Sequence, residues 1–341
     1  MKQEDKQNGK TTNNTSSIDG DGTGSWAAKT ITVATELGVF TLLHNNGPLP
    51  LEETAERLNI DIRPAEMLLN DCVSLELLDK ESGKYLNTTV TDKFLVKGMP
   101  SYFGDMIIHI GVERYDPFSH LKQAIQTNEP PCFGIDDLAT NPERAKEFTR
   151  AMHNNSIFSG IALSKVMDFS KFKCVLDLGG GSGGCSIMIT KEYPNLKGIV
   201  FDYAPVRKVA DEYIEKMGAA SNVTTCSGDY WIDELPGGAD IVLLGNILHH
   251  YDESKNRILL QKIYDYLPKE GMVIIVDFLL NDNKTGSVSS TLFALNMLLS
   301  QKGRTYSGKE VRQMLKNSGF VNVKTQIPLA GPQSVVYAIK Q

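Results

Sequence analysis

Two adjacent histidines, His249 and His250, end an apolar run in the segment LGNILHHYDES. Histidine titrates near neutral pH, so it serves as a general base in many enzymes. The chain has only six histidines. However, a histidine pair where a strand meets a loop is more commonly just a polar end to that strand. The residues around the pair must decide between these two interpretations.

A second segment whose residues could form a functional site is the glycine-rich stretch VLDLGGGSGG, residues 175–184. Its pattern predicts a buried strand that runs into a tight loop and then a helix. Glycine permits the sharp turn and the close approach of a ligand at the carboxyl end of the first strand. Gly179, Gly181 and Gly184 also match the GxGxxG spacing of dinucleotide-binding loops, so NAD is one candidate cofactor.

Acidic residues follow the next two predicted strands. Asp202 ends the strand in GIVFDYAP, where an acid can accept hydrogen bonds from ribose hydroxyls; capping the following helix is the alternative role. Asp229 and Tyr230 follow the third strand in CSGDYW, where the acid can accept from an adenine amino group and the ring can cover the base. NAD and S-adenosylmethionine both contain adenosine. The ordered set resembles an S-adenosylmethionine-dependent methyltransferase more than a dehydrogenase.

The elements that position these residues follow from the periodicity. From Cys174 onward, short β-branched runs alternate with helical stretches, which predicts a doubly wound, Rossmann-like α/β fold with a parallel sheet. Because ligands gather at the carboxyl ends of such strands, the glycine loop, Asp202, Asp229 and His249 are expected at one edge. We expect four regions: a disordered tail (1–24), a winged-helix dimerisation domain (25–100), a helical linker and lid (101–170) and a catalytic domain (171–341).

The region 25–100 raises a second class of function, a DNA-binding regulator. Its helices and hairpin predict a winged helix, with Met67, Leu68, Cys72 and Leu75 on one helical face. However, Trp26 to Pro100 holds seven Lys or Arg against eleven Asp or Glu. Phosphate contacts need a basic face, so the charge disfavours DNA binding.

Composition sets further limits on partners and location. The 341 residues are 41% hydrophobic and 22% charged, with a net charge of -6, which argues against nucleic acid or anionic membranes as partners. No apolar stretch approaches the roughly 20 residues that span a bilayer. The five cysteines are scattered and form no CxxC motif, which indicates free thiols in a reducing cytoplasm rather than a zinc site.

Together these segments resemble the class I small-molecule O-methyltransferases typified by caffeic acid and hydroxyindole O-methyltransferases and their bacterial relatives. FTRAMHNNS is similar to the family's linker helix, which implies that Ser156 contacts the cofactor's carboxylate and that Met152 lines the acceptor pocket. NILHHYDE is similar to the segment that carries the family's general base, which implies His249 as the base and His250 as a bystander. The resemblance also implies S-adenosylmethionine as cofactor, a homodimer and no metal.

The resemblance has departures at the catalytic residues. Of the two acids that orient the base in plant members, the first falls on Asp277, shorter than the usual Glu, and the second falls on Thr305, which is no acid. The helix within SSTLFALNMLLSQKG offers acceptor-pocket candidates, for which core packing is the alternative. They are Phe293, Asn296 and Met297. We therefore expect O-methylation of a small aromatic hydroxylated metabolite. The alternatives are N- or C-methylation, a non-methylating relative, or a cofactor-sensing regulator.

Overall fold

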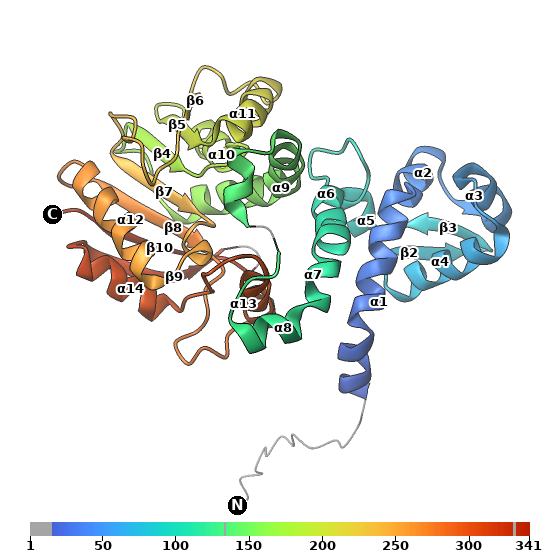
Figure 1. The fold of residues 1–341 in the computed structure, drawn as a ribbon. Coiled ribbons are helices and arrows are strands. Elements are labelled where there is room, and N and C mark those ends of the chain that lie inside the picture. Colours follow the sequence, from blue (N-terminus) through green and yellow to red (C-terminus); the bar gives the residue numbers. More distant parts are fainter. Residues whose placement is uncertain (1–15, 133, 330–331) are drawn as a thin grey trace, which may run out of the picture. The chain divides into compact units, whose positions relative to one another are not determined.

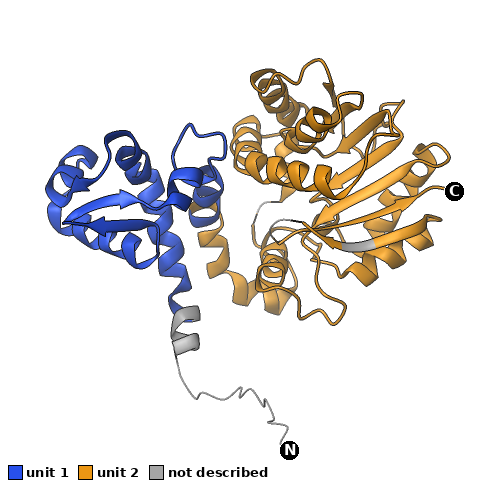
Figure 2. Cartoon of the chain, turned by 180° about the vertical axis from the view of Figure 1, so that it is seen from behind, with its two compact units in different colours: residues 1–111 blue, residues 112–341 orange. Residues whose placement is uncertain are grey.

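The computed structural model describes residues 16–132, 134–329 and 332–341, with side chains from residue 22 onward except 325 and 326. The chain forms two compact units, residues 1–111 and residues 112–341 (Figure 2). The division between them falls inside the segment 101–170 that the sequence predicts as a separate helical linker. All of the candidate site residues lie in the second unit.

The first unit begins with a long helix. Helix α1 spans Ser16–Glu36, so it overlaps the last part of the tail predicted for residues 1–24. Residues 1–15 lie outside the described residues. A left-handed glycine, Gly38, separates α1 from helix α2 (Val39–Asn46), because its positive φ of 78° ends the first helix and turns the chain.

The rest of the first unit is a small α+β arrangement. Helix α4 buries Ala65, Leu69 and Cys72 against the core of this unit. Of the predicted apolar face, Cys72 is therefore buried, whereas Met67 is 57% exposed. This unit also contains a three-stranded antiparallel sheet in the order β1-β3-β2. Its strands β2 and β3 come after the helices, as the predicted order of helices and hairpin requires. The winged-helix assignment stays a prediction. The elements are β1 (Leu49–Pro50), α3 (Leu51–Leu58), α4 (Ile62–Ser74), β2 (Leu78–Glu81), β3 (Lys84–Asn87), α5 (Thr89–Phe94) and α6 (Gly104–Ile108).

The second unit is built on a seven-stranded sheet in the order β6-β5-β4-β7-β8-β10-β9 (Figure 1). The first five strands in this order are parallel, as predicted, but β10 pairs antiparallel with both β8 and β9. For β9 and β10 the reason is their separation in the sequence, since β9 ends at Pro328 and β10 begins at Ser334, which leaves too few residues for the crossover that parallel neighbours need. The strands are β4 (Cys174–Leu178), β5 (Lys197–Asp202), β6 (Val223–Ser227), β7 (Ile241–Gly245), β8 (Met272–Asp277), β9 (Val321–Pro328) and β10 (Ser334–Ile339).

Helices cover both faces of this sheet, which confirms the predicted α/β class. Successive residues of β4 point to opposite faces: Leu176 packs with α12 and α14, and Val175 packs with α9 and α10. A third helix, α11, lies on the same face as α10, where Val200 contacts Ala210 and Ile214. The covering helices are α9 (Pro142–Val166), α10 (Gly184–Glu192), α11 (Ala204–Lys216), α12 (Glu253–Tyr266) and α14 (Gly308–Asn317).

Shorter helices complete the second unit. Helix α13 (Val288–Ser300) packs against the short helices α7 (Tyr115–Ser119) and α8 (Leu121–Thr127), and against the 3-10 turn Leu248–His250. Asp252 follows that turn after Tyr251, and its carboxylate caps helix α12 by accepting the Lys255 N–H. The cap fixes where α12 begins and therefore where the histidine pair lies at the end of the sheet.

Within the described ranges, no helix is both long and apolar enough to cross a membrane. The same residues hold no cluster of three or more His, Cys, Asp or Glu side chains that could bind a metal ion. All five cysteines are free thiols, of which Cys72 and Cys185 are buried.

Candidate active site

The glycine loop connects β4 to α10 through three left-handed residues. Gly179, Gly181 and Gly183 have φ values of 68°, 58° and 71°, a region in which side chains with a Cβ are strained. The Gly179 N–H donates to Phe201 O at 2.8 Å, which ties the start of the loop to the neighbouring strand β5. No other atom lies within 4 Å of the position that a Cβ on Gly181 would take, so the loop has open space on that side.

Asp202 lies at the end of β5 and holds the same loop. Its Oδ2 accepts the Gly181 N–H at 2.9 Å and its Oδ1 accepts the Tyr203 N–H at 2.7 Å. Burial raises the pKa of Asp202 to about 6, although these two hydrogen bonds and the partial exposure of the side chain favour the charged form. Each carboxylate oxygen keeps a second lone pair, so Asp202 can accept hydrogen bonds from two ligand hydroxyls.

A second buried acid, Asp177, supports the loop from below. Its carboxylate accepts the Ser186 hydroxyl of α10 at 2.8 Å, and burial raises its pKa to about 6. Strand β4 therefore contributes a polar anchor to the helix that follows the loop.

Asp229 and Tyr230 follow β6 at the same end of the sheet. Asp229 accepts the Trp231 N–H at 2.8 Å through Oδ1, which fixes the side chain. The Tyr230 ring lies in the sheet core, and its hydroxyl is 2.7 Å from the Tyr251 hydroxyl. An added Cβ on Gly179 would be 3.5 Å from Tyr230 Cε1, so one ring edge faces the loop. Its predicted role of covering an adenine ring stays a prediction.

Helix α9 supports the glycine loop from the linker segment. Ser156 Oγ accepts the Cys185 N–H at 2.9 Å in the first turn of α10. This places Ser156 at the positive end of a helix, where a ligand carboxylate is favoured. Met152, the predicted pocket residue on the same helix, is half-buried.

His153 is a site residue that the sequence reasoning missed. Its Nδ1 lies 2.8 Å from the Ser182 hydroxyl in the glycine loop, and its ring stacks on Tyr213 with centroids 3.5 Å apart. Burial, followed by the nearby Lys216, lowers the pKa of His153 to about 4, so the ring is neutral at pH 7. The signal was its position three residues before Ser156, on the same helical face.

His249 forms a buried pair with Asp277 at the carboxyl ends of β7 and β8. The Nδ1 atom of His249 is 2.6 Å from Asp277 Oδ1, and the side chains are 4% and 3% exposed. Asp277 also accepts the backbone N–H groups of His249, at 3.3 Å, and of Phe278, at 2.7 Å. Because a carboxylate only accepts, Nδ1 carries the proton, and the lone pair of Nε2 remains free to take another proton.

His250 differs from its neighbour. Its ring centroid is 4.2 Å from that of His249. Burial, with further contributions from His249 and Arg114, lowers the pKa of His250 well below its usual value. The lowered pKa makes His250 a weaker base than an ordinary histidine. Its bystander role stays a prediction.

The three pocket candidates on α13 have different surroundings. The Phe293 ring lies edge-to-face with His249 at 4.8 Å and stacks on Phe278 at 4.2 Å. Asn296 Oδ1 is buried and has no hydrogen-bond partner among the described residues, so it can accept from a ligand donor. Met297 is almost completely buried, as core packing would require. The buried Thr305 donates to the backbone oxygen of Ser290 at 3.3 Å rather than to His249.

Comparison with known proteins identifies both parts of the chain. Residues 118–321 match the O-methyltransferase domain, and residues 23–97 match the O-methyltransferase dimerisation domain. The 3-hydroxy-5-methyl-1-naphthoate 3-O-methyltransferase of Streptomyces sahachiroi is 35% identical to this chain over 322 residues, which cover 93% of each protein. An N,N-dimethyltransferase of Streptomyces rimosus is 31% identical, over 86% of this chain and 87% of that protein.

A solved structure agrees with this assignment. The crystal structure of human N-acetylserotonin methyltransferase in complex with S-adenosylmethionine matches with a TM-score of 0.89 and 25% identity, over 98% of this chain and 99% of that one. Asp202 and the glycine loop fit the ribose hydroxyls of such a cofactor, since both carboxylate oxygens keep free lone pairs beside open space. Because both family domains match and relatives align over nearly the full length, the chain belongs to the S-adenosylmethionine-dependent O-methyltransferases and carries their dimerisation domain.

Proposed function

We propose that this enzyme methylates a hydroxyl group on a small aromatic acceptor, with His249 as the general base. The observation that supports this most directly is the buried 2.6 Å pair of His249 and Asp277, with the Phe293 ring against the imidazole. Asp277 holds the tautomer whose Nε2 can accept the acceptor's proton. It then stabilises the imidazolium by charge, as the acid does in other histidine-carboxylate pairs.

A general base such as His249 suits a phenol, because the phenol must lose its proton during methyl transfer. S-adenosylmethionine would supply an electrophilic methyl group on a sulfonium. The acceptor oxygen would attack the methyl carbon from the side opposite to sulfur, and S-adenosylhomocysteine would leave as the carbon–sulfur bond breaks. A phenol has a pKa of about 10 and a histidine one of about 6.5, so proton transfer before displacement is uphill by about 5 kcal/mol. The phenol becomes more acidic as its oxygen bonds to the methyl group. His249 can therefore take the proton during the displacement.

The residues near His249 favour an aromatic acceptor. Phe293 and Phe278 present stacked rings beside the base, and flat ligands gain from such faces. Asn296 Oδ1 adds one buried acceptor atom on the same helix as Phe293. The Streptomyces sahachiroi relative acts on a hydroxynaphthoate, which is a fused aromatic acceptor. We therefore favour a hydroxylated, fused-ring aromatic substrate.

For the cofactor we propose contacts from the residues at the glycine-loop end of the sheet. In this proposal Asp202 accepts hydrogen bonds from the ribose hydroxyls, and Asp229 and Tyr230 hold the adenine. Ser156, at the start of α10, is placed for the methionine carboxylate. Gly181 leaves open space beside the loop for the cofactor.

We also propose a homodimer, since the chain carries the dimerisation domain and several large apolar side chains of the first unit are exposed. Trp26, for example, is 71% exposed. Burying such side chains against a second copy removes apolar area from water. The cytoplasmic location inferred from the cysteines stays a prediction.

An N-methylating role is the second candidate, because the Streptomyces rimosus relative is an N,N-dimethyltransferase and Thr305 supplies no second acid. The two are separated by incubating the protein with S-adenosylmethionine and matched acceptors, hydroxynaphthoates and hydroxyindoles on one side and their amino analogues on the other. Product mass and fragmentation show which atom carries the methyl group. Methylation of the amines alone would contradict the proposal.

A further inference from the structure

Residues 303–310 run from the loop after α13 into the first turn of α14, and their backbone packs on the turn that carries His249. An added Cβ on Gly303 would lie 2.1 Å from the His249 backbone oxygen and 2.4 Å from both His250 C and Tyr251 N. Real Cβ atoms do not approach backbone atoms this closely, so only glycine fits here without a shift of the chain. We call residues 303–310 the bracing segment.

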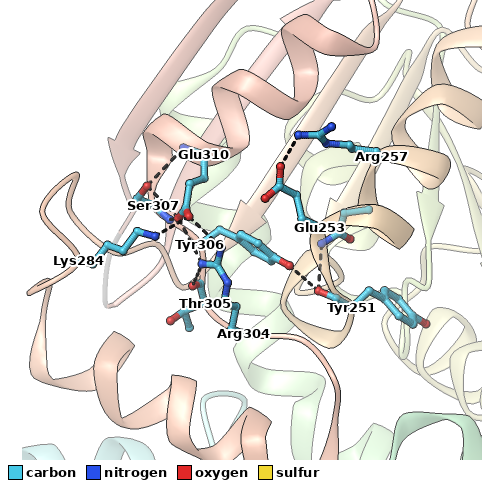
Figure 3. A network of polar contacts seen from close by, with 10 residues as sticks. Tyr251, Glu253, Arg257, Lys284, Arg304, Thr305, Tyr306, Ser307 and Glu310 are labelled. Carbon is cyan, nitrogen blue, oxygen red and sulfur yellow. Dashed lines mark hydrogen bonds and ion pairs between the residues drawn. The ribbon is translucent and has the colours of Figure 1, made fainter. Parts of the chain in front are cut away.

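A second contact of the bracing segment with the same turn is made by Tyr306. The buried Tyr306 hydroxyl donates to the Tyr251 backbone oxygen at 2.6 Å (Figure 3). Tyr306 also accepts, through its own backbone oxygen, the Leu280 N–H that follows β8. The bracing segment therefore joins the His249 turn to the end of the strand that carries Asp277.

Glu310 anchors the bracing segment at its other end. Its Oε1 accepts from Lys284 at 2.7 Å and from Arg304 at 2.8 Å, and its Oε2 accepts the Ser307 N–H at 2.8 Å (Figure 3). Burial alone would raise the pKa of Glu310, but the hydrogen bonds from Arg304, Lys284 and Ser307 outweigh it and lower the pKa to about 2. The carboxylate is therefore charged near neutral pH.

The two cations on Glu310 flank α13. Lys284 precedes the helix and Arg304 follows it, so one carboxylate pairs with residues of both segments that flank the helix carrying Phe293. Thr305, next to Arg304, donates to the backbone oxygen of Ser290, one helical turn before Phe293. The bracing segment is thus hydrogen-bonded to α13, which carries Phe293, and packs on the turn that carries His249.

We propose that the bracing segment is a positioning element for the methyl transfer, with Gly303 and Glu310 as its positioning residues. It sets the distance between the His249 imidazole and the acceptor-facing side of α13, through backbone packing at Gly303 and the ion pairs of Glu310. In plant members of the family, an acid at the position of Thr305 helps to orient the base. In this chain the bracing segment supplies part of that support by packing. The inference rests on the proposed role of His249 as base.

The first test is a double-mutant cycle with Gly303→Ala and His249→Ala. The acceptor is whichever of the hydroxynaphthoate, hydroxyindole and catechol panel the wild-type enzyme methylates fastest. Gly303→Ala should lower kcat by roughly tenfold or more, because a misplacement of about 1 Å is costly in catalysis. S-adenosylhomocysteine affinity should stay within about twofold. The matched control is Gly237→Ala, since no atom lies within 4 Å of that Cβ position.

The cycle separates positioning from general damage. If Gly303 acts through His249, the double variant will turn over no more slowly than His249→Ala alone. The defect of Gly303→Ala should also shrink above the acceptor's pKa, because an ionised acceptor needs no base. A loss that is equal at every pH and additive with His249→Ala would overturn the inference, as would full kcat in a folded Gly303→Ala variant.

The second test uses Glu310→Gln, which keeps the size of the side chain and serves if Gly303→Ala does not fold. We expect a higher KM for the acceptor with unchanged S-adenosylhomocysteine affinity, because the ends of α13 are released. Glu253→Gln is the control: it removes an exposed pair with Arg257 on α12 (Figure 3). Equal KM values in both variants would contradict the anchoring role. An active His249→Ala variant would instead remove the base, and with it this inference.

Discussion

The Nδ1 atom of His249 lies 2.6 Å from Oδ1 of Asp277, and both residues are at least 97% buried within the second unit. Asp277 orients the imidazole through Nδ1, so Nε2, the nitrogen that can accept a proton, faces away from the acid. His249→Ala should lower kcat by roughly 10²–10⁴, as expected for loss of a general base. S-adenosylhomocysteine affinity, measured by calorimetry, should be nearly unchanged. Near-full turnover by this variant would refute the base assignment.

Asp277→Asn should have a smaller effect than His249→Ala. The amide still contacts Nδ1 but can donate to it, which favours the tautomer with the proton on Nε2. The base would then be protonated on the wrong nitrogen in part of the population. Steady-state kcat at saturating acceptor tests this, and a loss greater than that of His249→Ala would show that Asp277 does more than orient the ring.

Asp202→Ala should weaken S-adenosylhomocysteine binding before it changes chemistry. The pH dependence gives a second measurement. The pKa of Asp202 is raised to about 6, so the charged carboxylate that we propose as the partner of the ribose hydroxyls is lost as pH falls through 6. Affinity should therefore be constant above about pH 7 and fall at lower pH. Calorimetric titrations between pH 5 and pH 8 would show this. An affinity that does not change with pH would argue against Asp202 as the hydrogen-bond acceptor for the ribose hydroxyls.

His153 should make stability depend on pH. Its pKa is lowered to about 4 in the folded state, below the unfolded value of 6.5. The unfolded chain therefore binds more protons between these values, so the free energy of unfolding falls as pH decreases from 6.5 towards 4. Urea unfolding at pH 7 and pH 5 should show a smaller difference for His153→Phe than for the wild type. An equal difference in both proteins would remove His153 as the cause.

The assembled protein should be a dimer. Because the dimerisation domain exposes large apolar side chains such as Trp26 and Met67, we expect an interface of more than about 2,000 Å². Light scattering at micromolar concentration should give twice the mass of one chain. A monomer mass under these conditions would contradict the proposed assembly.

The sequence predicted the parts of the site that depend on local pattern. The glycine loop, Asp202 and His249 each follow a strand, and strand ends converge at one edge of a parallel sheet. It could not predict Gly303 as a contact of the His249 turn, because the two segments lie 54 residues apart and the contact is between backbones. His153 was missed for a related reason: its partners, Ser182 and Tyr213, come from two other elements.

Two further differences have plain physical causes. Alternation of short strands and helices predicts parallel pairing, but β9 and β10 lack a helix between them and therefore pair antiparallel. In α4, apolar residues occupy more than one face, so periodicity alone could not separate the buried Leu69 from the exposed Met67. An exposed apolar side chain in a dimerisation domain agrees with a surface that a second copy covers.

The contacts of the glycine loop bear on the order in which the nascent chain assembles. Ser156 and Cys185 are 29 residues apart, and Gly181 and Asp202 are 21 apart, so the loop's supports lie within a continuous stretch from α9 to β5. The turn that carries His249 instead needs Tyr306, which is 55 residues beyond Tyr251. Closing a longer loop costs more entropy. During synthesis, the cofactor-binding half of the site is therefore translated and can form before the residues that fix the base have left the ribosome.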